Sequence, residues 1–171
     1  MKRRLGMMMV MLSMILGVGI KNILAEEPGN QTELAQALKA AKIPLTKGLS
    51  ASQKMGQPIS GKYELENGKL QLSVYTKKGD KFSEVIVDYI NGKILKTETI
   101  ASGDDLIHAK EQSEAIAKAK VSLVVATQKA IQANKGFKAI SVIPSVKNNQ
   151  PIAEVTLLKG SESKTVSEEL N

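Results

Sequence analysis

Three side chains near the middle of the chain are the first candidates for chemistry. His108 is the only histidine, and it follows Asp104 by four residues and Asp105 by three. In a helix this spacing brings the three together at one turn, where an imidazole and two carboxylates could contribute to a metal site. Sites that use neutral histidine normally need further ligands in a fixed shell. We therefore interpret both aspartates as favourable charges at a helix N-terminus, and His108 as an exposed side chain.

Other routes to catalysis have little support in the sequence. The chain contains no cysteine, which excludes thiolate nucleophiles, thiol redox chemistry and cysteine-ligated zinc. It contains no G-x-S-x-G, H-E-x-x-H or phosphate-loop motif. Asp88 precedes an Asn91-Gly92 pair, so its carboxylate is expected to organise a turn. The sequence predicts a protein that is not an enzyme, with no catalytic residue, cofactor-binding residue or metal ligand.

Residues 1–25 have the order of segments found in a secretory signal peptide. Lys2, Arg3 and Arg4 precede an apolar run over residues 5–20, and Ala25 offers the small residue of a cleavage site. The run is shorter than the roughly 20 residues that span a bilayer, which favours cleavage over a retained anchor. We expect export to the periplasm, or further to the outside of the cell, and no stable membrane insertion of the mature chain.

The charge of the chain falls once the predicted signal peptide is removed. Residues 26–171 carry 20 basic and 17 acidic side chains, a balance of +3 compared with +7 for the whole chain. Aromatic residues make up 3% of the sequence and tryptophan is absent, so bases would find few rings on which to stack. These features predict no nucleic-acid partner. Without cysteine, hydrophobic packing alone must hold the fold.

Residues 31–100 have the pattern of two short helices followed by an antiparallel meander. The expected elements are helices over 31–42 and 45–55, a hairpin over 62–75, and strands over 82–90 and 93–100. The hairpin signal is Asn67-Gly68, a pair that favours the type I′ turn. Further turns are expected at residues 78–80 and at Asn91-Gly92.

Residues 104–171 show a similar order of elements. Residues 104–135 contain neither glycine nor proline and predict a long helix, whose apolar stripe begins at about Ile116. Strands are expected over 137–146, 151–158 and 163–170. When the halves are aligned so that Gly79 falls on Gly160, Val74 falls on Val155, which indicates an internal repeat. In this alignment the second half ends opposite Ile90 and lacks the last strand of the first.

The first half resembles the PepSY domain, a small α+β module in which a helix packs on an antiparallel sheet. The resemblance lies in residues 85–95, VIVDYINGKIL, where an apolar strand, Asp88, the Gly92 turn and a second apolar strand follow one another. Residues 122–146 and 151–160 resemble the helix and early strands of the same module, without its Asp-and-Gly ending. The resemblance implies an exported protein that binds or restrains a partner, and it implies no catalytic residues.

These patterns together predict an α+β protein of two tandem helix-plus-antiparallel-sheet modules. The expected boundaries are a signal peptide at 1–25, a first module at 26–102, and a second module at 103–171 that begins with the long helix. The expected function is non-catalytic binding of an envelope protein or peptide, with regulation of a peptidase as one form of it. The alternative is binding or sensing of a small ligand or metal ion. A flat or strand-edge patch would favour the first function, and a concave polar pocket the second.

Overall fold

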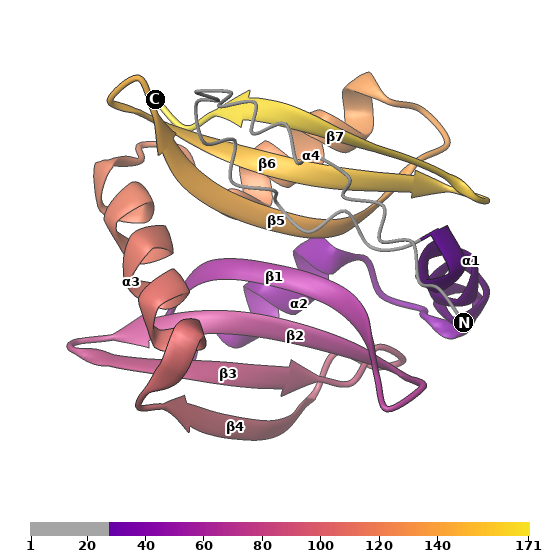
Figure 1. Cartoon of the computed structure of the whole chain (residues 1–171), viewed down its shortest axis with the longest axis horizontal. Coiled ribbons are helices and arrows are strands. Elements are labelled where there is room, and N and C mark those ends of the chain that lie inside the picture. The colour runs from indigo at the N-terminus through magenta and orange to yellow at the C-terminus, as the bar shows by residue number, and fades with distance from the viewer. Residues whose placement is uncertain (1–27) are drawn as a thin grey trace, which may run out of the picture.

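The computed structural model describes residues 28–171, so the predicted signal peptide at 1–25 lies outside the described residues. The helical elements are α1 (Pro28–Ala37), the 3₁₀ helix η1 (Leu38–Ala40), α2 (Leu45–Ser52), α3 (Gly103–Lys118) and α4 (Leu123–Ala133). The strands are β1 (Gln57–Glu66), β2 (Lys69–Lys78), β3 (Lys81–Val87), β4 (Ile94–Ile100), β5 (Lys138–Lys147), β6 (Gln150–Lys159) and β7 (Glu162–Glu169). All of these strands form one antiparallel sheet in the order β4-β3-β2-β1-β5-β6-β7 (Figure 1).

The prediction of two tandem helix-plus-sheet modules is wrong, because β1 and β5 pair with each other and join both halves into one sheet. Gly61 faces Val142 and Lys62 faces Ser141 across this seam. In separate modules β1 and β5 would both be edge strands, with unpaired backbone groups that favour pairing. The coarser α+β class stands, since helices and strands are both well represented among the described residues.

The hairpin turns form where the asparagine and glycine residues predict them. Between β1 and β2, Asn67 and Gly68 have φ values of 50° and 74°, as both central positions of a type I′ turn require. Between β5 and β6, Asn148 and Asn149 have φ values of 50° and 63°. Asparagine is among the few residues that adopt this left-handed backbone without glycine. The predicted hairpins at these two turns are therefore confirmed.

The strands of the two halves have the same spacing along the chain. The starts of β1, β2 and β3 are separated by one constant offset from those of β5, β6 and β7, at Gln57 and Lys138, Lys69 and Gln150, and Lys81 and Glu162. The ladder irregularity at Pro58/Ser60 recurs at Ala139/Ser141. The seam pairs Gly61 with its own counterpart, Val142, which is the arrangement that a twofold axis through the seam produces.

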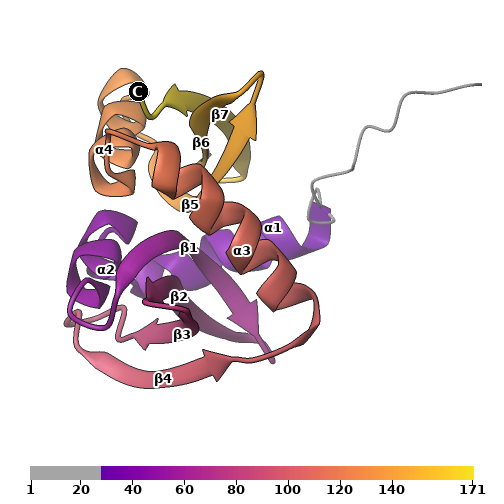
Figure 2. The same ribbon diagram turned by 90° about the vertical axis from the view of Figure 1, so that its left-hand side faces the viewer.

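Helices cover both faces of the sheet. Helices α2 and α4 lie on one face, whereas α1 and α3 lie on the other (Figure 2). On the α2 face, Gly48 lies against the side chain of Leu72. On the α3 face, the Ser60 hydroxyl donates a 2.6 Å hydrogen bond to the side-chain oxygen of Gln112. The two faces have different characters, because the α2 and α4 face is mainly aliphatic and the other carries most of the polar side chains of the central strands.

The alternation in the predicted strands and the apolar stripe of the predicted helix predict eleven core residues, and all but two of them are buried. Leu70 and Ile131 are only partly buried, although both pack against the core. The buried members of the predicted set are Leu72, Val74, Val85, Val87, Leu123, Ile140, Val142, Val155 and Leu157. The alternation of apolar and polar residues thus set the strand faces correctly.

The helical segment expected over 104–135 is two helices, because tertiary hydrogen bonds interrupt it after Lys118. The backbone N–H groups of Lys120 and Val121 donate to the carbonyl of Leu170, at 2.6 and 3.1 Å. The Ser122 hydroxyl then accepts from the N–H of Val125 at 3.3 Å and caps α4. Helix propensity is a weak preference, and these long-range partners override it.

Candidate functional site

His108, Asp104 and Asp105 all lie in the first turns of α3, as their spacing predicts. The His108 Nδ1 is 3.6 Å from a carboxylate oxygen of Glu111, one turn further along, and both side chains are largely exposed. The described residues contain no group of three or more acidic or histidine side chains placed to hold a metal ion. Asp104 and Asp105 occupy the first turn of α3, where negative charge is favourable.

Asp88 organises its own turn, and that prediction is confirmed. Its carboxylate accepts hydrogen bonds from the backbone N–H groups of Ile90 and Asn91, at 2.7 and 3.3 Å. It also accepts from the Asn91 side-chain amide at 2.7 Å. The loop between β3 and β4 is thus held by one carboxylate, which has a structural role there.

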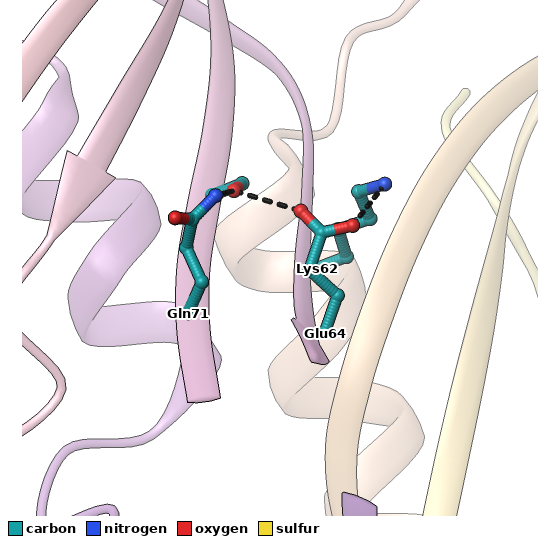
Figure 3. A network of polar contacts seen from close by, with 4 residues as sticks. Lys62, Glu64 and Gln71 are labelled. Atoms are coloured by element: carbon teal, nitrogen blue, oxygen red, sulfur yellow. Dashed lines mark hydrogen bonds and ion pairs between the residues drawn. The ribbon is translucent and has the colours of Figure 1, made fainter. Parts of the chain in front are cut away.

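A polar network covers the sheet face of the N-terminal half. The Gln71 amide donates to the Ser73 hydroxyl, and Ser73 donates to Glu64, each at 2.9 Å (Figure 3). The other oxygen of Glu64 forms an ion pair with Lys62 at 2.6 Å. The donors and acceptors of this face therefore satisfy one another, which leaves them little capacity to bind a further molecule.

Larger side chains fill the same face beside the network. Tyr75 and Glu84 pair across β2 and β3, and Phe82 is almost fully buried at the start of β3. Burial raises the pKa of the Tyr75 hydroxyl, and the nearby carboxylates of Glu84 and Glu64 raise it further. Burial also raises the pKa of Glu84, against the opposing influence of Ser73. These shifts indicate a face that is already packed and partly dehydrated.

The C-terminal half has a hollow of about 680 Å³ on the corresponding face. It lies over β5, β6 and β7, and Gln31 and Leu34 of α1 form one side of it. The other lining residues are Lys62, Tyr63, Ile140, Ser141, Ile143, Glu154, Thr156, Ser163, Lys164, Thr165 and Ser167. The hollow therefore combines hydroxyl groups and the Glu154 carboxylate with an aliphatic side near α1.

The hollow exists because small residues replace large ones at corresponding positions. At the constant offset of the strands, the pairs are Tyr75 and Thr156, Phe82 and Ser163, Glu84 and Thr165, and Ile86 and Ser167. Each large side chain of the N-terminal half has a hydroxyl-bearing counterpart that lines the hollow. The Thr156 and Thr165 hydroxyls lie 3.2 Å apart and can still accept or donate toward the hollow.

The C-terminal half also ends its sheet differently. In the N-terminal half β4 covers β3, with pairs that run from Phe82 and Ile100 to Val87 and Ile94. In the part of the chain that the structure describes, no strand takes the corresponding place beside β7. Among the described strands, β7 is therefore an edge of the sheet.

The sequence interpretation missed this face because it searched for acids, bases and nucleophiles. None of Ser163, Thr165 and Ser167 forms a motif, and serine and threonine are frequent on exposed strands. The signal that could have found them is the alignment of the two halves, read one position at a time for side-chain volume. That comparison shows four large-to-small changes on one face and one change in the other direction, from Ser73 to Glu154.

Comparisons of the chain with protein-family models, with curated proteins and with solved structures found no match. None of the helices in residues 28–171 is both long enough and apolar enough to cross a membrane.

Proposed function

We propose that the protein acts by contact, and that the open face of the C-terminal half binds an extended segment of another protein. The observation that carries this proposal is the loss of side-chain volume at Thr156, Ser163, Thr165 and Ser167 on an otherwise repeated strand framework. Hydroxyl groups and the Glu154 carboxylate give an extended peptide hydrogen-bonding partners, while the exposed Ile143 offers apolar contact. No catalytic residue is part of the proposal.

The PepSY resemblance agrees with this proposal, since that family is associated with binding and restraint of a partner. The partner would then be a protein or peptide of the cell envelope, met after export by the signal peptide at residues 1–25. Regulation of a peptidase is one form that such binding could take.

A small-molecule ligand is the second candidate, because the volume of the hollow favours it. Ligand sites commonly enclose about 300–1,000 Å³, and this hollow has about 680 Å³. Its mixed lining would suit a polar molecule with an aliphatic portion. The peptide is preferred because the hollow extends over three strands, which an enclosed small-molecule site does not need.

The test fills the hollow with the side chains of the N-terminal half. Thr156→Tyr combined with Ser163→Phe restores the residues that stand at positions 75 and 82. Linear peptides are first selected from a random displayed library on the unaltered protein, and the affinities of the selected peptides are then measured by calorimetry. The filled variant should bind them at least tenfold more weakly, with its melting temperature as the check that it is folded.

The matched control is Thr99→Tyr, which adds a ring at an exposed position of β4, away from the hollow. It should leave peptide affinity unchanged. A library that yields no binders, or binders that hold the filled variant as tightly as the original, would refute the peptide proposal. A fragment screen followed by NMR separates the second candidate, which predicts shifts at Ser141, Thr156 and Thr165 without peptide binding.

A further inference from the structure

The charges along β7 are ordered so that two antiparallel copies of this strand can place opposite charges next to each other. The strand reads Glu162-Ser-Lys164-Thr-Val166-Ser-Glu168-Glu169, with Lys164 and Glu168 placed symmetrically about Val166. Alternate residues of a strand lie on the same face, so Lys164, Val166 and Glu168 form one row. We propose that the outer edge of β7 pairs with β7 of a second copy of the chain, antiparallel and about a twofold axis at Val166. This inference concerns the strand edge, and it does not depend on what the hollow binds.

The side chains of this row are already held on the α4 side of the sheet. The Lys129 ammonium of α4 lies 3.5 Å from a carboxylate oxygen of Glu168. The Lys164 ammonium lies 4.3 Å from the centre of the Phe137 ring, and Val166 packs against the core. Because the three side chains are partly ordered in the single chain, less conformational entropy is lost when they form cross-strand pairs.

Among the registers in which at least five residues of β7 pair, only one brings opposite charges together. A twofold axis at Val166 places Lys164 of each copy opposite Glu168 of the other, and Thr165 opposite Ser167. An axis at Thr165 instead places Glu162 opposite Glu168, and axes at Lys164 or Glu168 place like charges face to face. An axis at Ser167 sets Val166 against Glu168. Directly opposed charges of opposite sign stabilise an antiparallel pair and like charges destabilise it, so the charges select the axis at Val166.

The chain already contains a pairing of this kind. At the seam, β1 and β5 meet edge to edge, antiparallel, with Gly61 opposite its counterpart Val142. A twofold axis perpendicular to the sheet relates two such strands. Side chains that lie on one face of the first strand then lie on the same face of the sheet in the second strand. Pairing of β7 with its copy would therefore continue one sheet through both chains and place their two hollows on a common face. Such an interface is isologous and closes at two copies.

The first experiment exchanges the charges. The purified unaltered protein should show concentration-dependent dimers by analytical ultracentrifugation. Lys164→Glu and Glu168→Lys should each weaken self-association at least tenfold, because every copy then meets like charge. An equimolar mixture of the two variants should associate again, since a Lys164→Glu copy and a Glu168→Lys copy form both attractive pairs. Lys96→Glu on β4, the other edge of the sheet, is the matched control and should leave the dimer unchanged.

The second experiment traps the register. The chain contains no cysteine, so Val166→Cys introduces a single thiol. Directly opposed residues of antiparallel strands have Cα atoms about 4.5–5.5 Å apart, within the range of a disulfide. Oxidation should convert Val166→Cys to a covalent dimer, whereas Thr97→Cys on β4 should stay monomeric. A protein that is monomeric at every concentration, a mixture of the charge variants that does not associate, or equal cross-linking of the two cysteine variants would overturn the proposal.

Discussion

The two halves of the sheet have strands of the same spacing but carry side chains of different size on one face. In the N-terminal half, Tyr75, Phe82 and Glu84 fill the face of the sheet that points away from α2, and β4 pairs with the outer edge of β3. In the C-terminal half, Thr156, Ser163 and Thr165 leave the corresponding face hollow, and β7 is an edge. Strand spacing and the ladder irregularity are the same in both. The proposed binding surface therefore differs from the packed face mainly in side-chain volume, on strands of the same spacing.

The largest expected effect tests how the first half is packed. Leu72 is fully buried under α2, whereas its counterpart in β6 is Ala153. Leu72→Ala should lower the free energy of unfolding by about 2–5 kcal/mol, because the cavity it leaves adds to the lost burial. Urea unfolding measures the loss. Leu95→Ala is the control, since Leu95 is 65% exposed and its truncation should change stability by less than about 0.5 kcal/mol. Equal midpoints for the two variants would contradict the packing described.

The next effect tests whether the helix and sheet of each half are matched in volume. A Cβ atom added at Gly48 would lie 2.7 Å from a methyl group of Leu72, which is closer than atoms approach without displacement. Gly48 is the fourth residue of α2, and the fourth residue of α4 is the larger Ala126. In the sheet of that half, the smaller Ala153 stands at the position that corresponds to Leu72. Gly48→Ala should therefore cost about 1–3 kcal/mol in the original protein.

In the Leu72→Ala protein the same change should have the opposite sign. The clash is then relieved, and alanine is a better helix former than glycine by up to about 1 kcal/mol. Unfolding of the four proteins in a double-mutant cycle measures the coupling. Additive effects of Gly48→Ala and Leu72→Ala would show that the two residues do not limit each other.

A smaller effect is expected at the loop that only the first half contains. Asp88→Ala removes three accepted hydrogen bonds between β3 and β4 and should cost about 1 kcal/mol, given the exposure of the loop. Amide hydrogen exchange should accelerate at residues 88–93 and in β4. Exchange in β6 and β7 serves as the internal control and should not change. Uniform acceleration would mean that the turn supports the whole sheet and not one strand.

The smallest effect concerns the packed polar face and depends on pH. Burial raises the pKa of Glu84 above its ordinary value of 4.5, so the folded state holds the proton more tightly than the unfolded chain. Ionised Glu84 therefore lowers stability as the pH rises through the raised pKa, and Glu84→Gln should stabilise the protein slightly at pH 7. The gain should disappear below the ordinary pKa, where Glu84 is protonated in both states. Thermal unfolding across pH 3–7 measures it, with exposed Glu33→Gln as a control that should show no such trend.

The sequence predicted local structure well where one turn or one alternation decides it. Asn67, Gly68 and Asp88 specify their turns through backbone conformation and short-range hydrogen bonds, and those turns formed as expected. The pairing of β1 with β5, which joins the two halves, could not be predicted in this way, because no local sequence feature at Gly61 or Val142 specifies that they pair. The break after Lys118 depends on the carbonyl of Leu170, which lies beyond three further strands in the chain. The hollow could not be predicted from a motif either, because it results from small side chains at positions where the first half has large ones.

The seam between β1 and β5 also imposes an order on folding. The hairpin of β1 and β2 closes through Asn67 and Gly68 alone, but the seam joins Gly61 to Val142, with β2, β3, β4, α3 and α4 between them in the chain. Such distant pairings carry a higher loop-closure entropy and form late. The outer edge of β1 therefore stays open until β5 pairs with it. Glycine at position 61 has low β-propensity, and it weakens the pairing of that open edge with the strands of other folding chains.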